Sequence, residues 1–239
     1  MNNHRFNIIA IGLAAASLAM VGTGCADSFL DVDSKTQSNT DNFYRTETDA
    51  WRALLGCYDG WKQTSSHVTQ GFYLASTIMS DETYGASGNS DNRVPQAWDQ
   101  FDQAQAASEL TMFSDAWKYY YAGVYRCNEL ITRQDNIEWD VASGKRGLYI
   151  GEARALRAIM YFDMVRLWGN IPLFLTPSGE NREQADPAEV YATIIDDLKF
   201  AAQNIPATAN RLPDEAGRIT KYAAEAMLAR VYPVSYTHL

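Results

Sequence analysis

Apolar residues recur every three or four positions along most of this chain, which is the spacing of one buried face of an α-helix. In the most regular stretch, Tyr149, Ala153, Leu156 and Met160 fall on a single stripe. The pattern predicts one helix that begins near residue 46 and another that begins at residue 220. Between them it predicts helices over 71–79, 108–133, 145–168 and 187–205. No segment alternates with the period of two that is typical of a β-strand, so the sequence predicts an all-α fold.

Local signals mark several of these helix ends. Thr46 and Asp49 have the spacing of a capping box, with Asp in place of the usual Glu. Asp186 before Pro187 suits the start of a helix, and Gly169 suits a C-terminal end. Helix pairs of this size, with alanine and aromatic contacts, predict antiparallel pairs in a TPR-like superhelical array with long loops.

The first 24 residues indicate an export signal. Arg5 is followed by an apolar run over 8–21, shorter than the roughly 20 residues that a membrane-spanning helix needs, and small residues come next. Small residues directly before Cys25 are typical of a bacterial lipoprotein signal. We therefore expect cleavage before Cys25, lipidation of that residue and an acidic tether over 25–45. An ordinary secretory signal with a chance cysteine is the alternative.

The last residues depart from the helical pattern. Pro233 interrupts the final predicted helix, and Val-Ser-Tyr-Thr-His-Leu over 234–239 resembles a translated sequencing-library adapter. We therefore expect 233–239 to be non-native and the last helix to stop at Tyr232. The helical domain over 46–232 is then expected to be an incomplete part of a longer chain.

Composition narrows the class of protein. Hydrophobic residues make up 46% of the chain and aromatic residues 12%, which is too much for a disordered chain. The formal net charge of −9 argues against a nucleic-acid partner, because such binding depends on Lys and Arg neutralising phosphates. Apart from Cys25, the cysteines are Cys57 and Cys127, on different predicted helices. Two buried thiols are the expected state, and a disulfide between them stays open.

Several segments are specific enough to compare with known families: Cys25, Phe29–Asp33, Trp117–Ile131, Glu152–Ala158, Tyr161–Leu173 and Gly217–Tyr232. In this order they resemble the motifs of the SusD/RagB family. The resemblance implies a surface-exposed outer-membrane lipoprotein of Bacteroidetes, helical with TPR-like pairs. It implies a glycan or other nutrient as ligand and a SusC-like TonB-dependent transporter as partner. It also implies that much of the ligand-binding region lies beyond the last helix.

The sequence contains few residues that could form a catalytic site. His67 is the only histidine outside the signal and the suspect tail, so histidine-based metal sites and catalytic triads are hard to assemble. Asp81 and Glu82 are adjacent, whereas a glycosidase needs its two carboxyl groups ~5–10 Å apart on either side of one bond. We expect no enzyme, no metal and no cofactor.

A polar segment offers better candidates for binding. Residues 80–105 are rich in glycine and polar side chains and are expected to form a long loop. Trp98 would give a flat aromatic face for a sugar, with Asp81, Asn92 and Arg93 as polar contacts. Packing of Trp98 in the core is the alternative.

Three arginines on the helix over 145–168 have a structural interpretation. Arg154, Arg157 and Arg166 are expected to pair with carboxylates such as Glu152 and Asp163 rather than with an anionic ligand.

The sequence as a whole therefore predicts a glycan- or nutrient-binding lipoprotein on the outer face of the bacterial outer membrane. A TPR-like protein-interaction scaffold without its own small ligand is the alternative, and an enzyme acting on polysaccharide is the third choice.

Overall fold

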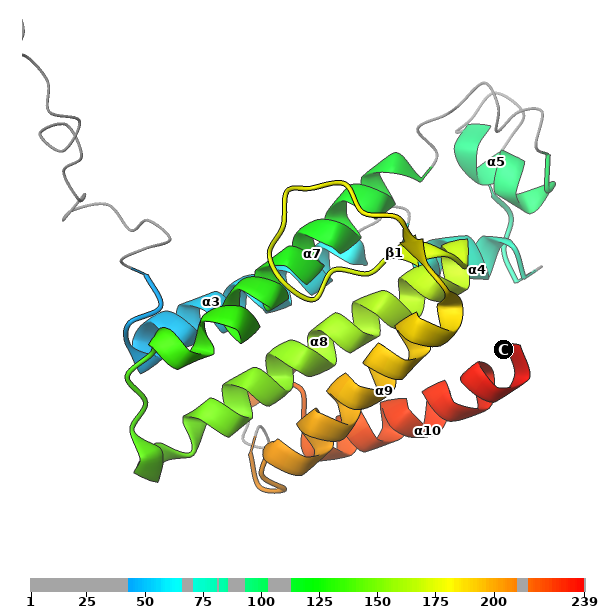
Figure 1. The fold of residues 1–239 in the computed structure, drawn as a ribbon. Coiled ribbons are helices and arrows are strands. Elements are labelled where there is room, and N and C mark those ends of the chain that lie inside the picture. Colours follow the sequence, from blue (N-terminus) through cyan, green and yellow to red (C-terminus); the bar gives the residue numbers. More distant parts are fainter. Residues whose placement is uncertain are drawn as a thin grey trace, which may run out of the picture. The chain divides into compact units, whose positions relative to one another are not determined.

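The computed structural model describes residues 43–65, 71–80, 82–85, 93–102, 113–209 and 215–238. Most of the residues in these ranges are helical, and the connections include two 3-10 turns and one short β-ladder (Figure 1). The elements are α3 (Glu47–Thr64), α4 (Phe72–Ile78), α5 (Arg93–Asp99), α7 (Ser114–Arg133), η1 (Gln134–Asn136), η2 (Val141–Ser143), α8 (Lys145–Trp168), β1 (Ile171–Pro172), β2 (Gln184–Ala185), α9 (Pro187–Asn204) and α10 (Lys221–His238). The predicted all-α fold is confirmed.

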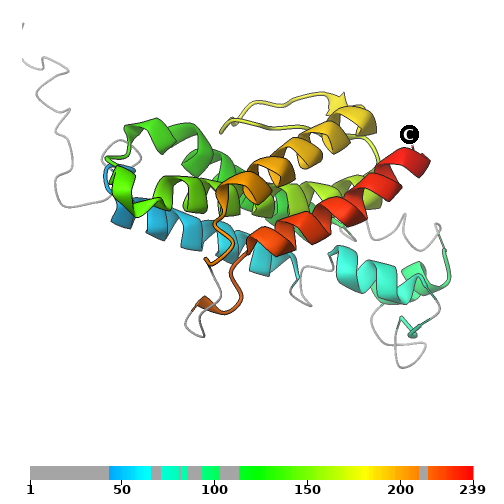
Figure 2. The same ribbon diagram turned by 90° about the horizontal axis from the view of Figure 1, so that it is seen from below.

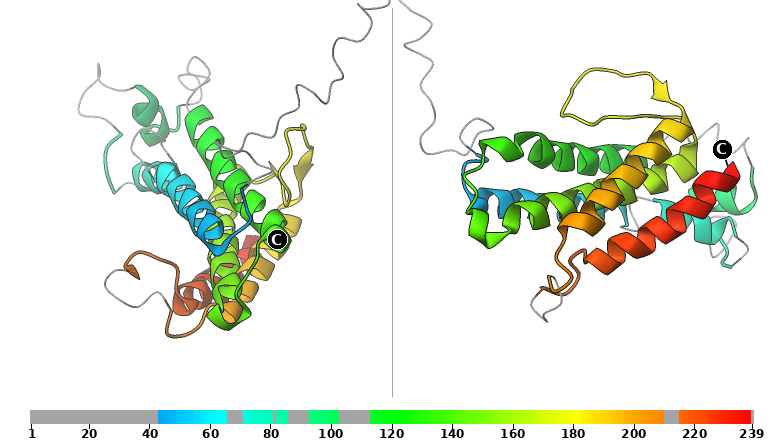
Figure 3. Two further views of the ribbon diagram at one scale, coloured as in Figure 1. Left: turned by 90° about the vertical axis from the view of Figure 1, so that its left-hand side faces the viewer. Right: turned by 60° about the horizontal axis from the view of Figure 1, so that its bottom comes forward.

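The long helices α3, α7, α8, α9 and α10 pack side by side and alternate in direction along the chain (Figures 1 and 2). Helix α8 contacts α3, α7 and α9, and α9 contacts α10. An end-on view places α8 between the α3–α7 pair and the α9–α10 pair (Figure 3). The expected antiparallel helix pairs are therefore present.

Helix α3 begins as its sequence predicts. The Thr46 hydroxyl accepts the Asp49 backbone N–H, and the Asp49 carboxylate accepts the Thr46 backbone N–H at 3.0 Å. These reciprocal bonds satisfy donors that a helix start leaves without partners, and they confirm the capping box. The apolar stripe of the helix, which includes Ala50 and Leu54, is buried.

Helices α3 and α7 approach each other closely at two glycines. A Cβ atom placed on Gly60 would lie 2.7 Å from the Gly123 Cα atom. A Cβ atom on Gly123 would lie 2.5 Å from the Met160 sulfur of α8. Only residues without a side chain fit at this contact, where α3, α7 and α8 meet.

The connection between α8 and α9 contains the only strands in the part of the chain that the structure describes. Gly169 ends α8 with a φ of +68°, a left-handed conformation that glycine adopts without strain. Ile171 then pairs with Ala185, and Pro172 with Gln184, in an antiparallel ladder. Two residues per strand are too few to show a period of two, so the sequence pattern missed this ladder.

The region expected to be one long loop contains a helix, and that prediction is wrong for Arg93–Asp99. Pro95 misled the interpretation, but it occupies the first turn of α5. A proline is tolerated there, because the N–H that it lacks would have no partner within the helix. The helix packs against α4 in a small apolar cluster that includes Ala75, Ile78 and Ala97.

Helix α10 also differs from its prediction, because it continues past Pro233 to His238. A proline inside a helix removes one hydrogen bond and clashes with the preceding turn, which kinks or breaks many helices. Val231 and Ser235 are both buried, one turn apart and on either side of Pro233. Burial on both sides favours a continuous helix over the expected stop at Tyr232.

Buried ion pairs join α8 to α9. Arg157 is 4% exposed and binds the Asp197 carboxylate through Nε and Nη2, both at 2.8 Å. Arg154 binds the same carboxylate through Nε at 2.7 Å and Asp196 through Nη2 at 2.9 Å. The expectation that these arginines pair with carboxylates is confirmed, although their partners are Asp196 and Asp197 on the facing helix, and Glu152 pairs with Arg218 instead. The expected pair of Arg166 with Asp163 is confirmed.

A second buried network fixes the segment that leads into α10. The Glu152 carboxylate is fully buried and accepts Arg218 Nη2 at 2.5 Å and the Tyr58 hydroxyl at 2.5 Å. The Tyr58 oxygen in turn accepts the Ile219 backbone N–H at 2.7 Å. The Arg218 guanidinium also lies over the Trp51 ring, 4.8 Å from its centroid. Residues from α3 and α8 therefore hold the chain just before α10.

The predicted signal peptide over 1–24 and most of the predicted tether lie outside the described residues. Within the described ranges, no helix has the length and apolar character needed to cross a membrane.

Candidate ligand-binding pocket

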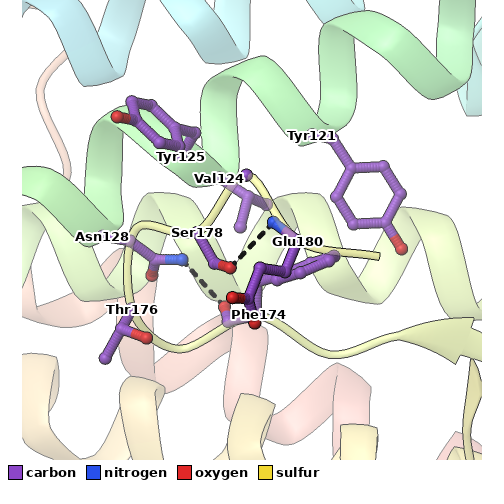
Figure 4. Close-up of a pocket in the computed structure, with 9 residues that line it drawn as sticks. Tyr121, Val124, Tyr125, Asn128, Phe174, Thr176, Ser178 and Glu180 are labelled. Atoms are coloured by element: carbon purple, nitrogen blue, oxygen red, sulfur yellow. Dashed lines mark hydrogen bonds between the residues drawn. The ribbon is translucent and has the colours of Figure 1, made fainter. Parts of the chain in front are cut away.

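A pocket of about 210 Å³ lies between α7 and the β1–β2 loop, residues 173–183 (Figure 4). Its walls combine aromatic and polar side chains from both elements. The lining residues are Tyr121, Val124, Tyr125, Asn128, Phe174, Thr176, Ser178, Gly179 and Glu180. A second hollow of about 400 Å³ lies along the same loop and shares Phe174, Thr176, Ser178 and Glu180 with the first. The loop therefore presents two adjoining concave surfaces.

The base of the β1–β2 loop is fixed by side chains of the helices beneath it. The Phe174 carbonyl accepts hydrogen bonds from Asn128 Nδ2 and from the Tyr161 hydroxyl, both at 2.8 Å. The Tyr161 oxygen also accepts the Phe174 N–H at 2.8 Å. Tyr121 donates to the Pro172 carbonyl at 2.8 Å. These bonds, made largely to backbone atoms, hold the loop whatever its side chains are.

The Asn128 amide is held from both ends. Its Nδ2 donates to the loop, and its Oδ1 accepts Arg157 Nη1 at 2.6 Å. Burial alone would lower the pKa of Arg157, but the hydrogen bonds and charge of Asp197 outweigh burial and raise it. The guanidinium therefore stays charged, and it connects the pocket wall to the buried ion pairs of α8 and α9.

The aromatic side of the pocket comes from α7 and from the loop. The Tyr121 and Phe174 rings meet edge to face, with centroids 5.7 Å apart. Tyr125 lies one turn further along α7 and is 47% exposed. A hydrogen bond to Glu129 raises the pKa of the Tyr125 hydroxyl, which stays protonated at neutral pH. An exposed ring beside a rigid wall suits contact with an uncharged ligand that carries both apolar and polar faces.

Polar groups complete the pocket on the loop side. The Ser178 hydroxyl accepts the Glu180 backbone N–H at 3.1 Å, which turns the loop tip back toward α7. The side chains of Thr176, Ser178 and Glu180 are exposed at this tip. Rings on one wall with a few hydroxyl and carboxylate groups on the other form the usual composition of a small-molecule site.

The structure does not give Trp98 the exposed face that a sugar platform needs. Trp98 is 4% exposed, and its ring stacks on Phe113 with centroids 5.0 Å apart. Its neighbours include Ala75 and Ile78 of α4. This placement favours the core interpretation, in which the aromatic ring packs inside the small α4–α5 cluster.

The other predicted site residues fall largely beyond what the structure describes. Cys25, Asp81 and Asn92 lie outside the described residues, and His67 does as well. Arg93 is the first residue of α5. Their grouping into one site, and the lipidation of Cys25, therefore stay predictions.

The sequence held one signal that pointed to the pocket, at Asn128. This residue follows Val124 by four positions on the buried stripe of α7, and an amide on such a stripe needs hydrogen-bond partners. The loop residues gave no signal, because Phe174 and Ser178 meet α7 only through the tertiary fold.

Among the described residues, no group of three or more His, Cys, Asp or Glu side chains is arranged to hold a metal ion.

The comparison that decides the family is a match over most of the chain. A family model described as starch-binding and associating with the outer membrane matches residues 28–233. The chain belongs to the SusD-like family. It is 27% identical over 232 residues to a SusD-like protein of Bacteroides ovatus, covering 92% of this chain and 38% of that one. It is 25% identical over 217 residues to a SusD-like protein of Formosa agariphila, covering 86% and 40%.

Solved structures of SusD-like proteins share the fold. A laminarin-binding SusD-like protein superimposes with a TM-score of 0.64 at 28% identity, over 79% of this chain and 40% of that one. A SusD homologue of Bacteroides thetaiotaomicron gives a TM-score of 0.62 at 24% identity, over 84% and 38%. The chain thus spans about two fifths of the length of the SusD-like relatives it matches. The family is one of carbohydrate-binding proteins that associate with the outer membrane, not of enzymes.

Proposed function

We propose that this chain is the helical part of a cell-surface glycan-binding lipoprotein that delivers its ligand to a SusC-like TonB-dependent transporter. The observation that carries the proposal is the family match over residues 28–233. The similarity to a laminarin-binding protein adds support for a polysaccharide as ligand. Because the chain is shorter than its relatives, the proposal assigns it part of the ligand surface.

The pocket beside the β1–β2 loop is the part of that surface that we assign to this chain. A sugar ring presents C–H groups on its faces and hydroxyls around its edge. Tyr125 offers an exposed ring for such a face, and Thr176 and Glu180 offer polar atoms for hydroxyls. The fixed loop base lowers the ordering cost of binding, because the wall is in place before the ligand arrives.

Replacing Tyr125 with alanine is expected to weaken glycan binding about tenfold, the usual scale for truncating a central aromatic contact. Isothermal titration of the full chain with laminarin and with starch oligosaccharides measures this effect. Tyr73→Ala is the matched control, because Tyr73 is 77% exposed on α4 and lines no part of the pocket. Equal affinities in the two variants would remove the pocket from the proposal. Absence of binding to either glycan by the unaltered chain would count against glycan binding by this part of the protein.

The lipid anchor is tested separately at Cys25. Mass spectrometry of the mature N-terminus is expected to find a chain that begins at Cys25 and carries acyl groups. Cys25→Ala is expected to shift the protein out of the membrane fraction. An unacylated N-terminus, or full membrane retention of the variant, would contradict the anchor. Neither result bears on ligand binding.

A protein-interaction scaffold is the second candidate, and one observation favours it. A hollow of about 270 Å³ is lined by facing residues of α3 and α7, which include Asp59, Gln63, Tyr119 and Arg126. A groove made by helix faces suits a bound peptide segment. Glycan titrations distinguish the two functions, because a scaffold alone would bind neither polysaccharide.

A further inference from the structure

Two cysteines lie side by side inside the α3–α7 pair. Cys57 is on α3 and Cys127 is on α7, and both are fully buried thiols in the structure. The Cys57 thiol contributes to the raised pKa of the Cys127 thiol, so the two side chains are close neighbours. Across the described residues, no third His, Cys, Asp or Glu joins them in a group that could hold a metal ion.

The helix packing brings the two cysteine backbones close together. Gly60 of α3 and Gly123 of α7 touch backbone to backbone, since a Cβ atom on Gly60 would lie 2.7 Å from the Gly123 Cα atom. The two helices run in opposite directions. The residue one turn before Gly60 on α3 therefore faces the residue one turn after Gly123 on α7. These two residues are Cys57 and Cys127. A disulfide needs Cα atoms about 4.4–6.8 Å apart, which helices packed at the usual ~8–10 Å between axes reach only at their closest contacts.

We propose that Cys57 and Cys127 are oxidised to a disulfide that cross-links α3 and α7 in the exported protein. The family associates with the outer membrane, so its members pass through the periplasm, where disulfides form and persist. The proposal does not depend on the ligand, and it stands or falls separately from glycan binding.

The reaction is thiol–disulfide exchange with a disulfide of the oxidoreductase class. One cysteine thiolate attacks the S–S bond of the oxidant, forms a mixed disulfide and releases one oxidant thiol. The second cysteine thiolate attacks the protein sulfur of the mixed disulfide and releases the second oxidant thiol. The bond between the two Sγ atoms forms as the oxidant S–S bond is lost. Two electrons and two protons pass from the cysteines to the oxidant.

The burial of the pair sets when exchange takes place. Neither sulfur is accessible to an oxidant once α3 has docked on α7. Burial, with a further contribution from the Cys57 thiol, raises the pKa of Cys127 well above its usual range, so the Cys127 sulfur stays a thiol in the folded dithiol. The disulfide therefore forms while the exported chain is folding, before α3 docks on α7. Once formed, the bond is buried and shielded from reductants.

Peptide mapping of the full chain tests the proposal. The chain is expressed in a bacterium with its own leader, denatured in N-ethylmaleimide without reductant, and digested with trypsin. Cleavage places the cysteines on separate peptides, Ala53–Lys62 and Cys127–Arg133. The expected result is a linked pair of these two peptides, which reduction separates with a gain of about 2 Da in total mass. In Cys57→Ala the peptide Cys127–Arg133 is expected to carry N-ethylmaleimide instead.

Two results would overturn the proposal. One is N-ethylmaleimide on both peptides of the unaltered chain, which means that the thiols stay reduced after export. The other is a link from either peptide to Cys25 or to a second protein. The mapping is done on denatured protein, so it stays decisive even if the Cys57→Ala variant does not fold.

Discussion

Replacement of Asp197 with alanine is expected to lower the free energy of unfolding by about 3–5 kcal/mol, as is usual when one partner of a buried ion pair is removed. Asp197 is 1% exposed and accepts three hydrogen bonds from Arg154 and Arg157. Without the carboxylate, the Arg157 guanidinium is left charged and buried. Urea denaturation followed by circular dichroism measures the loss.

The neighbouring residue supplies a matched control. Asp196 also binds Arg154, but its side chain is 74% exposed, so Asp196→Ala is expected to cost about 1 kcal/mol or less. Asp197→Asn keeps an acceptor oxygen and is expected to fall between the two alanine variants. Equal stabilities of Asp197→Ala and Asp196→Ala would mean that the buried ion pairs of Asp197 add no more to the free energy of unfolding than the exposed pair of Asp196.

Alanine at Gly60 is expected to destabilise the protein by about 1–3 kcal/mol, the usual cost of forcing extra atoms into a packed contact. The new Cβ atom would lie 2.7 Å from the Gly123 Cα atom, and a backbone atom cannot rotate away as a side chain can. Helix α3 must therefore move off α7. Thermal unfolding measured alongside the unaltered chain gives the size of the effect.

Gly56→Ala on the same helix is the control for this change. A Cβ atom on Gly56 would meet nothing within 4 Å, so the substitution leaves only the gain in helix propensity. We expect it to stabilise the protein by about 0.5–1 kcal/mol. The two glycines are one turn apart on the same helix. If Gly60→Ala lowers the stability and Gly56→Ala raises it, the difference comes from the α3–α7 contact. Stability changes of the same sign would contradict that interpretation.

The helices were predictable because their signals are local. The Thr46 capping box, the Asp186 start and the Gly169 end each depend on residues within four positions, and each is found where the sequence placed it. The predicted helix over 108–133 is described from Ser114 to Arg133.

The pairing of charges and the pocket were not predictable in the same way. Arg157 lies 40 positions from Asp197, and Asn128 lies 46 from Phe174, so nothing nearby in the sequence identifies either partner. Glu152 was the obvious carboxylate for Arg154 because it is close in sequence, yet it faces Arg218 instead. The sequence offers Trp98 as a flat face for a sugar, whereas its aromatic ring packs in the α4–α5 cluster through the tertiary fold.

The hydrogen bond from Ile219 to Tyr58 joins residues 161 positions apart. In a helical solenoid, each repeat contacts only its neighbours, and a terminal repeat can fray while the rest stays folded. Here the buried Glu152 carboxylate of α8 binds both Tyr58 of α3 and Arg218 in the segment before α10. Detaching either end would leave that carboxylate short of a partner in the interior. Opening of α3 and of the segment before α10 is therefore coupled, and amides in these two places should exchange with solvent in a shared event rather than helix by helix.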